Sequence, residues 1–369
     1  MAAPSRSAAA SSAAGGGPRR EAVTAIDAYG GWPAVLGRLT RGEDLGRDEA
    51  GAAMATVLAG EASAAQIAGL IIALRIKGET VDELAGMVGA MLDAAEPLDL
   101  PADTVDIVGT GGSPRRRERA LNVSTMASFV AAGAGTTICK HGNVKASSTS
   151  GSFDLLGALG VRYDLDAGRI SEVVREVGVG FCFARAFHPA MRHAGPVRAE
   201  LGVPTVFNVL GPLSHPGRVR RQVLGVGDPR LLDLVAGVLA ARGTTHALVV
   251  HGADQLDELS LSGPTHVREV RDGAVVASYD LAPGDLGLTE VASADMPGGT
   301  AEDNAVIARA LLDGARGPAH DIVALNAAAA IYVGGRASTI AEGLELARAS
   351  LETGAARRAL DRLVVASIA

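Results

Sequence analysis

The sequence is poor in aromatic residues, lysine, cysteine and long apolar runs, and each shortage excludes a class of protein. Phe, Trp and Tyr make up 3% of the 369 residues, so a large core must be packed mainly from Ala, Val and Leu. With 34 basic and 41 acidic residues the net charge is −7, which argues against a general nucleic-acid binder. No apolar run reaches the roughly 18 residues that a membrane helix requires, which predicts a soluble, cytoplasmic protein without a membrane partner.

The two cysteines and the N-terminal segment also carry little specific information. Cys139 and Cys182 lie in short apolar runs without CxxC spacing, a pattern typical of buried free thiols rather than of a metal site. The first 22 residues are rich in Ala, Ser and Gly and contain a few Arg, but they lack the continuous apolar stretch of a secretory signal. We expect residues 1–22 to form a disordered tail, with a transit peptide as the alternative.

Two different patterns divide the rest of the chain. Over residues 23–97 apolar side chains recur at steps of three and four, which predicts a small all-helical domain. Over residues 102–369 short β-branched runs alternate with helical stretches. This alternation predicts a larger α/β domain whose central, mostly parallel sheet is flanked by helices. A helical stretch at about 187–215 is expected to return to the first domain and join it.

A glycine-rich turn follows the apolar run VDIVG directly. Gly109, Thr110, Gly111 and Gly112 can turn several backbone N–H groups toward one anion, although ordinary strand-to-helix turns also use glycine. Residues 122–125 (NVST) then open a helix with two hydroxyl groups at its N-terminus. That arrangement is either a second anion site or an ordinary helix cap.

A polar stretch, Lys140 to Ser152, follows the β-branched run TTIC. It contains two of the three lysines, a histidine, an asparagine and several hydroxyl groups, with almost no acid. Such a density of hydrogen-bond donors suits a polyanion such as pyrophosphate. Because ligands of α/β proteins bind at the carboxyl ends of strands, the position favours a binding loop over a solvated polar loop.

An acidic pair, Asp257 and Glu258, follows the apolar run HALVVH. Acidic pairs are common on protein surfaces, but Mg²⁺ takes one or two carboxylates together with phosphate groups of a substrate. Combined with the two candidate phosphate loops, the pair predicts a substrate that is a magnesium-bound diphosphate.

These motifs together resemble the anthranilate phosphoribosyltransferase family of tryptophan biosynthesis. The resemblance rests on GTGG, NVST, KHGN, VRAELGVPTVFNVLGPLSHP and the HG…LDEL segment, in this order, and extends from about residue 25 to the C-terminus. It implies a helical domain, a larger α/β domain and a homodimer. It also implies transfer of the phosphoribosyl group of 5-phosphoribosyl 1-pyrophosphate (PRPP) to the amine of anthranilate, with Mg²⁺ as cofactor and pyrophosphate as the second product.

The resemblance also assigns residues. It implies catalytic roles for Lys140, His141 and Asn143, and Mg²⁺ ligation by Ser124, Asp257 and Glu258. Anthranilate would be bound by Gly109, Asn143 and Arg198, with His141, His188 and Pro189 nearby. Arg198 has a physical case of its own, because a carboxylate substrate favours a forked, permanently charged donor. PRPP would be bound by Gly109, Gly112, Ser113, Asn122, Val123, Ser124, Thr125, Lys140, His141, Gly142, Asn143, Ser147, Ser148 and Ser152.

The sequence departs from the family pattern around the glycine-rich turn. Ser113 replaces the usual Asp, Val144 replaces the usual Arg, and the stretch Pro114 to Arg119 is longer and more basic than usual. We expect this basic stretch to contact phosphate. Three alternatives remain: a paralogue that uses another aromatic carboxylate, a non-catalytic nucleic-acid-binding relative, and a pyrimidine nucleoside phosphorylase, whose phosphate-loop pattern the sequence lacks.

Overall fold

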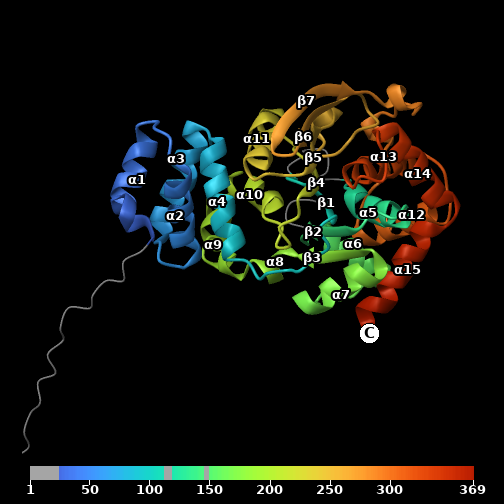
Figure 1. The fold of residues 1–369 in the computed structure, drawn as a ribbon, viewed down its shortest axis with the longest axis horizontal. Coiled ribbons are helices and arrows are strands. Elements are labelled where there is room, and N and C mark those ends of the chain that lie inside the picture. The colour runs from blue at the N-terminus through green and yellow to red at the C-terminus, as the bar shows by residue number, and fades with distance from the viewer. Residues whose placement is uncertain (1–24, 112–118, 145–148) are drawn as a thin grey trace, which may run out of the picture.

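The computed structural model describes residues 25–111, 119–144 and 149–369, so Gly112 and Ser113, most of the basic stretch, Ser147 and Ser148 lie outside the described residues. The described chain begins with a short 3₁₀ turn, Ala25–Tyr29, and a bundle of helices at one end of the molecule (Figure 1). Its helices are α1 (Gly31–Thr40), α2 (Arg47–Leu58), α3 (Ala64–Lys77) and α4 (Val81–Asp93).

Local sequence explains where α3 and α4 begin. Ser63 and Thr80 each accept a hydrogen bond from a backbone N–H in the first turn, and Gln66 and Glu83 bond back to the cap residue. These reciprocal bonds satisfy N–H groups that a helix start leaves without an intrahelical partner. The two helix starts are therefore fixed by local hydrogen bonds.

The second part is built on a seven-stranded sheet with the order β3-β2-β1-β4-β5-β6-β7. The first five strands are parallel, and β6 and β7 continue the sheet antiparallel. The predicted α/β class with a mostly parallel sheet is confirmed. The strands are β1 (Val105–Gly109), β2 (Ile138–Gly142), β3 (Val179–Phe183), β4 (Arg221–Gly225), β5 (His246–His251), β6 (Thr265–Arg271) and β7 (Ala274–Leu281).

Alternating side chains of β1 belong to two large cores on the two faces of the sheet, and Cys139 and Cys182 of β2 and β3 belong to a third, smaller one. Val105 and Ile107 of β1 join the core formed with α5 and the C-terminal helices, whereas Val108 joins the core that continues into the helical bundle. The helices of the first face are α5 (Val123–Gly133), α6 (Ser152–Leu159), α7 (Ala167–Val177), α12 (Ala301–Leu312), α13 (Pro318–Val333), α14 (Ile340–Glu352) and α15 (Ala355–Ile368).

The other face of the sheet is covered by α11 (Leu232–Ala241) and, through it, by the bundle, because α11 contacts α4. Between β3 and β4 the chain forms the short helices α8 (Ala184–Phe187), α9 (Gly195–Leu201) and α10 (Phe207–Leu213). Helix α9 contacts α3, and α10 contacts α4. We propose on these contacts that residues of about 187–215 complete the helical domain, as the sequence predicts.

Within the described ranges, no helix combines the length and apolarity needed to cross a membrane. Cys139 and Cys182 are free and buried, as expected.

Candidate functional site

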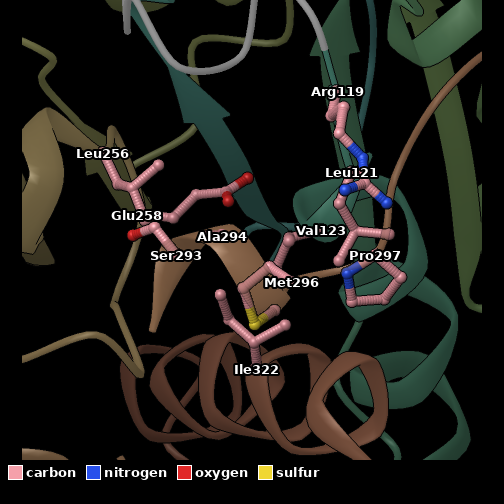
Figure 2. A pocket seen from close by; sticks show the side chains of 10 residues that line it. All are labelled: Arg119, Leu121, Val123, Leu256, Glu258, Ser293, Ala294, Met296, Pro297 and Ile322. Atoms are coloured by element: carbon pink, nitrogen blue, oxygen red, sulfur yellow. The ribbon is translucent and has the colours of Figure 1, made fainter. Parts of the chain in front are cut away.

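One cavity of about 760 Å³ collects most of the predicted site residues. It lies at the carboxyl ends of the parallel strands and reaches the helical segment at Arg198. The predicted residues that line it are Gly109, Asn122, Ser124, Thr125, Lys140, His141, Gly142, Asn143, Ser152, Arg198, Asp257 and Glu258. Three described residues that the sequence analysis named do not line it: His188 and Pro189, and Val123, whose side chain is buried in the core and lines a different pocket (Figure 2).

Lys140 is the buried cation of the cavity, with 3% of its surface exposed. Its Nζ donates to the carbonyls of Ile107 at 2.7 Å and His141 at 3.2 Å, so strand backbones fix the ammonium group at the cavity wall. Asp106 lies beneath it and accepts a bond from the His141 N–H at 3.0 Å. Burial raises the pKa of Asp106. Sequence reasoning missed Asp106, although an acid inside an apolar strand run was a usable signal.

Three histidine rings form a row behind the loop. The ring of His141 lies 5.3 Å from that of His188 and 5.7 Å from that of His215, between centroids. Burial, followed by the charges of His215 and His188, places the pKa of His141 well below its usual range, and burial also lowers the pKa of His188. Both rings are therefore neutral at neutral pH.

In the His188→Asn variant, the free energy of unfolding is expected to fall less than in wild type when the pH is lowered. A histidine whose folded pKa is lowered contributes its full stability above the ordinary value of 6.5 and loses it as the pH falls below that value. The loss approaches about 1.4 kcal/mol per pH unit for one group. Melting midpoints at about pH 7.5 and about pH 5.5 measure it. An equal drop in variant and wild type would show that His188 does not titrate on unfolding.

The N-terminus of α5 is held in place from two directions. Ser150 Oγ donates to Asn122 Oδ1 at 2.7 Å, and the Asn122 N–H donates to Asn304 Oδ1 at 3.0 Å. Asn304, fully buried on α12, also donates to the carbonyl of Ala120 at 2.8 Å. Asn304 thus positions the helix start that carries Ser124 and Thr125.

The acidic pair lies at the floor of the same cavity. Asp257 and Glu258 are 5% and 6% exposed, and the Gly111 N–H donates to Asp257 Oδ2 at 2.8 Å. The loop before them turns through Asp254 and Gln255, whose φ angles of 62° and 60° are unusual for residues other than glycine. Two carboxylates and the Ser124 hydroxyl facing one cavity form the all-oxygen donor set that Mg²⁺ takes, so the residues fit this cation.

Glycines at the ends of β1 and β4 let the acidic loop close over the sheet. A Cβ at Gly109 would overlap the Asp257 carboxylate, and a Cβ at Gly225 would overlap the Asp257 backbone carbonyl. Gly225 was not among the residues predicted from the sequence. Its position at the end of the apolar run QVLG was the sequence feature that could have identified it.

Gly225→Ala is therefore expected to lower kcat/KM for the diphosphate substrate that the sequence predicts by about a hundredfold or more, because a displaced Asp257 costs several kcal/mol of stabilisation. Gly89→Ala is the matched control, since a Cβ there meets no atom within 4 Å. Steady-state kinetics of both variants, with melting curves to confirm folding, test this. Wild-type kinetics of Gly225→Ala would contradict the close packing.

Arg198 of α9 also lines the cavity. Its guanidinium carbon lies 5.0 Å from the centre of the Phe207 ring, and burial lowers its pKa. No carboxylate forms an ion pair with it among the described residues, Glu200 included. A half-buried, permanently charged group of this kind suits an anionic ligand.

Cys139, Cys182 and His215 form a buried cluster below the row of histidines, with their ligand atoms within 4.8 Å of one another. The Gly217 N–H donates to His215 Nδ1 at 3.0 Å, so the ring proton is on Nε2, which faces the Cys139 carbonyl at 2.9 Å. An Nε2 atom that carries a proton has no lone pair for a metal. The cluster therefore acts as a hydrogen-bonded part of the core.

Comparison with known proteins covers nearly the whole described chain. Residues 33–95 match the helical bundle domain of the glycosyl transferase family, and residues 101–357 match its a/b domain. The chain is 52% identical over 338 residues to the anthranilate phosphoribosyltransferase of Thermomicrobium roseum, covering 90% of this chain and 96% of the relative. It is 48% identical to that of Nocardioides sp., covering 91% and 98%.

Solved structures agree with these relatives. The anthranilate phosphoribosyltransferase of Thermus thermophilus superimposes with a TM-score of 0.86 at 44% identity, covering 91% of this chain and 99% of that one. The Saccharomyces cerevisiae enzyme in complex with PRPP and Mg superimposes with a TM-score of 0.82 at 28% identity, covering 91% and 98%. The chain belongs to the anthranilate phosphoribosyltransferase family.

Proposed function

We propose that this chain is a phosphoribosyltransferase that joins the phosphoribosyl group of PRPP to the amine of anthranilate and releases pyrophosphate. The observation that carries the proposal is that one cavity is lined by a buried acidic pair, a buried lysine and the half-buried Arg198. Such a cavity suits a magnesium-bound diphosphate next to an anionic acceptor.

The diphosphate and ribose phosphate are assigned to the loops after β1 and β2 and to the N-terminus of α5. Gly109, Asn122, Ser124, Thr125 and the stretch from Lys140 to Asn143 line this part of the cavity. Backbone N–H groups at a helix start and a fixed ammonium group stabilise negative charge without reorganising. Ser152 adds a hydroxyl, and the assignments of Gly112, Ser113, Ser147 and Ser148 rest on the family pattern alone.

Asp257, Glu258 and Ser124 would hold Mg²⁺ on the diphosphate, consistent with the yeast complex named above. The cation supplies charge neutralisation for the departing pyrophosphate. Lys140 and the N–H groups of α5 add to this stabilisation from the protein side. Asn143 and the neutral His141 face the same space and are assigned to orienting the reacting groups.

The residues assigned to anthranilate hold it in position and do not supply a strong base. A bond forms between the amine nitrogen and C1 of the ribose, the bond from C1 to the pyrophosphate oxygen breaks, and the nitrogen loses a proton. An aromatic amine is already nucleophilic when neutral, so holding it near C1 is the main requirement. Arg198 would bind the carboxylate, and Gly109 and Asn143 would line the path to C1.

Assembly as a homodimer and a cytoplasmic location are proposed on family membership. Light scattering at several protein concentrations tests the first, and a tagged chain viewed in cells tests the second.

A panel of acceptors tests the proposed substrate against the paralogue alternative. The purified chain is incubated with PRPP, Mg²⁺ and one of several aromatic acids: anthranilate, its 3- and 4-amino isomers, or salicylate. We expect kcat/KM for anthranilate to exceed the others by at least about tenfold, since Arg198 and the site of attack fix the spacing of carboxylate and amine. A higher value for another acid would favour the paralogue.

A further inference from the structure

The strands β1 and β2 separate from each other as they approach the main cavity. Strand β1 pairs with β4 along all five of its residues, whereas its register with β2 is confined to Val105 and Ile138. Strand β2 remains paired with β3 over its whole length. A gap therefore opens between the two strands whose carboxyl ends carry the candidate phosphate loops.

Side chains replace the backbone hydrogen bonds in this gap. Lys140 Nζ donates to the carbonyls of Ile107 on β1 and of His141 on β2. In the opposite direction, the Asp106 carboxylate on β1 accepts a bond from the His141 N–H at 3.0 Å. These bonds satisfy buried backbone groups that a continuous parallel ladder would pair with the neighbouring strand. Asp106 and Lys140 therefore join the two strands where the ladder has ended.

The carboxylate of Asp106 is held on both of its oxygens. It is 0% exposed and does not line the main cavity, so it acts from behind the cavity wall. Its second oxygen accepts from Gln222 Nε2 on β4 at 3.0 Å, and the same nitrogen donates to the Pro212 carbonyl at 2.9 Å. Burial raises the pKa of Asp106, and the positive charge of Lys140 is among the influences that counteract this rise. The carboxylate is thus fixed between β2 and β4 and interacts with the Lys140 charge.

We propose that Asp106 is a positioning residue for the diphosphate site. By holding the His141 N–H, its carboxylate fixes the end of β2 from which Lys140 reaches across to β1. The ammonium group is thereby kept at the cavity wall, where preorganised charge stabilises an anion without having to reorient. The inference rests on the proposed function, which assigns the diphosphate to Lys140 and the neighbouring loops.

The direction of the effect distinguishes positioning from simple electrostatics. A negative charge behind the site repels a diphosphate, so its removal alone would strengthen diphosphate binding. Loss of positioning has the opposite effect, because the loop and the ammonium group are no longer held in the arrangement that fits the ligand. Asp106→Asn keeps the size of the side chain but has one acceptor oxygen and no charge. We therefore expect this variant to bind a diphosphate more weakly than wild type.

Calorimetric titration of the full chain with inorganic pyrophosphate and Mg²⁺ measures the effect. Asp106→Asn should weaken pyrophosphate binding by at least about tenfold, the range of one hydrogen bond to a charged group, and should lower kcat/KM for PRPP by a similar factor. Gln222→Met is the matched control, because it removes the bond to the other oxygen of the same carboxylate and leaves that to His141. Both constants should change by less than about threefold in this control.

The Lys140→Met background tests whether Asp106 acts through Lys140. There, Asp106→Asn should change pyrophosphate affinity by less than about threefold, because side chains of one network have non-additive effects. Equal fold-losses in the two backgrounds would overturn the positioning role. Unchanged or tighter pyrophosphate binding by folded Asp106→Asn, or equal losses in Asp106→Asn and Gln222→Met, would overturn it as well.

Melting curves show whether each variant folds. If Asp106→Asn does not fold, Asp106→Ser takes its place with the same expected loss, since a hydroxyl still accepts a hydrogen bond. Failure of both variants to fold would assign Asp106 to the fold and overturn the proposal. The expected pattern of pyrophosphate binding without transferase activity would overturn the proposed function alone. Wild-type transferase kinetics of Asp106→Asn would overturn this inference alone.

Discussion

Replacement of both Asp257 and Glu258 by alanine is expected to abolish turnover while leaving the fold intact. The two carboxylates are the acidic oxygen donors at the floor of the main cavity among the described residues, and both are buried. Loss of a cation that neutralises a departing diphosphate removes several kcal/mol of transition-state stabilisation. Each 1.36 kcal/mol is a factor of ten, so kcat should fall by about a thousandfold or more.

The comparison requires saturating Mg²⁺ and a matched control. Glu290→Ala removes an exposed acid and should leave kcat unchanged. Circular dichroism and melting curves would confirm that the double variant folds. Wild-type turnover of the folded double variant at saturating Mg²⁺ would exclude the acidic pair from the metal site.

Arg198→Ala is expected to lower kcat/KM for anthranilate by about ten- to a thousandfold and to leave that for aniline nearly unchanged. Hydrogen bonds to charged groups contribute about 1.5–3 kcal/mol each, and one or two would be lost. Aniline has no carboxylate, so it cannot lose them. Arg198→Lys should recover little, because an ammonium group does not present the planar fork of a guanidinium.

The Arg198 variant needs a control because this side chain also contacts Phe207. Its guanidinium packs against Phe207, so the alanine variant also loses a stabilising interaction inside the helical segment. Binding of PRPP, measured by calorimetry, should change little in the variant. Equal losses of kcat/KM on anthranilate and aniline would mean that Arg198 supports the fold, and the carboxylate assignment would fail.

Local patterns in the sequence were sufficient to predict the fold class and most of the cavity. Apolar runs that end in Gly or a polar residue identify strands, and parallel strands bring their carboxyl ends to one edge of the sheet. The motifs after β1, β2 and β5 therefore had to meet, and the structure places them around one cavity. The match to a known family extended this to residues such as Arg198, which no local pattern singles out.

Contacts that join distant parts of the chain could not be predicted in the same way. Asn304 holds the start of α5 although it lies 182 residues from Asn122. Gly225 is needed only because the Asp257 backbone packs closely against it, and no periodic pattern in the sequence predicts such a close contact. The antiparallel continuation of the sheet by β6 and β7 could likewise not be predicted from the order of strand-like and helical stretches. Strand direction depends on the connections between strands.

The measurement that tests the central claim most directly is a time course of anthranilate fluorescence with the purified chain, PRPP and Mg²⁺, with pyrophosphate assayed in parallel. We predict that anthranilate fluorescence falls only when the chain, PRPP and Mg²⁺ are all present, with one pyrophosphate released for each anthranilate consumed. Unchanged anthranilate fluorescence with a folded chain, or anthranilate loss without pyrophosphate, would contradict the proposed transfer.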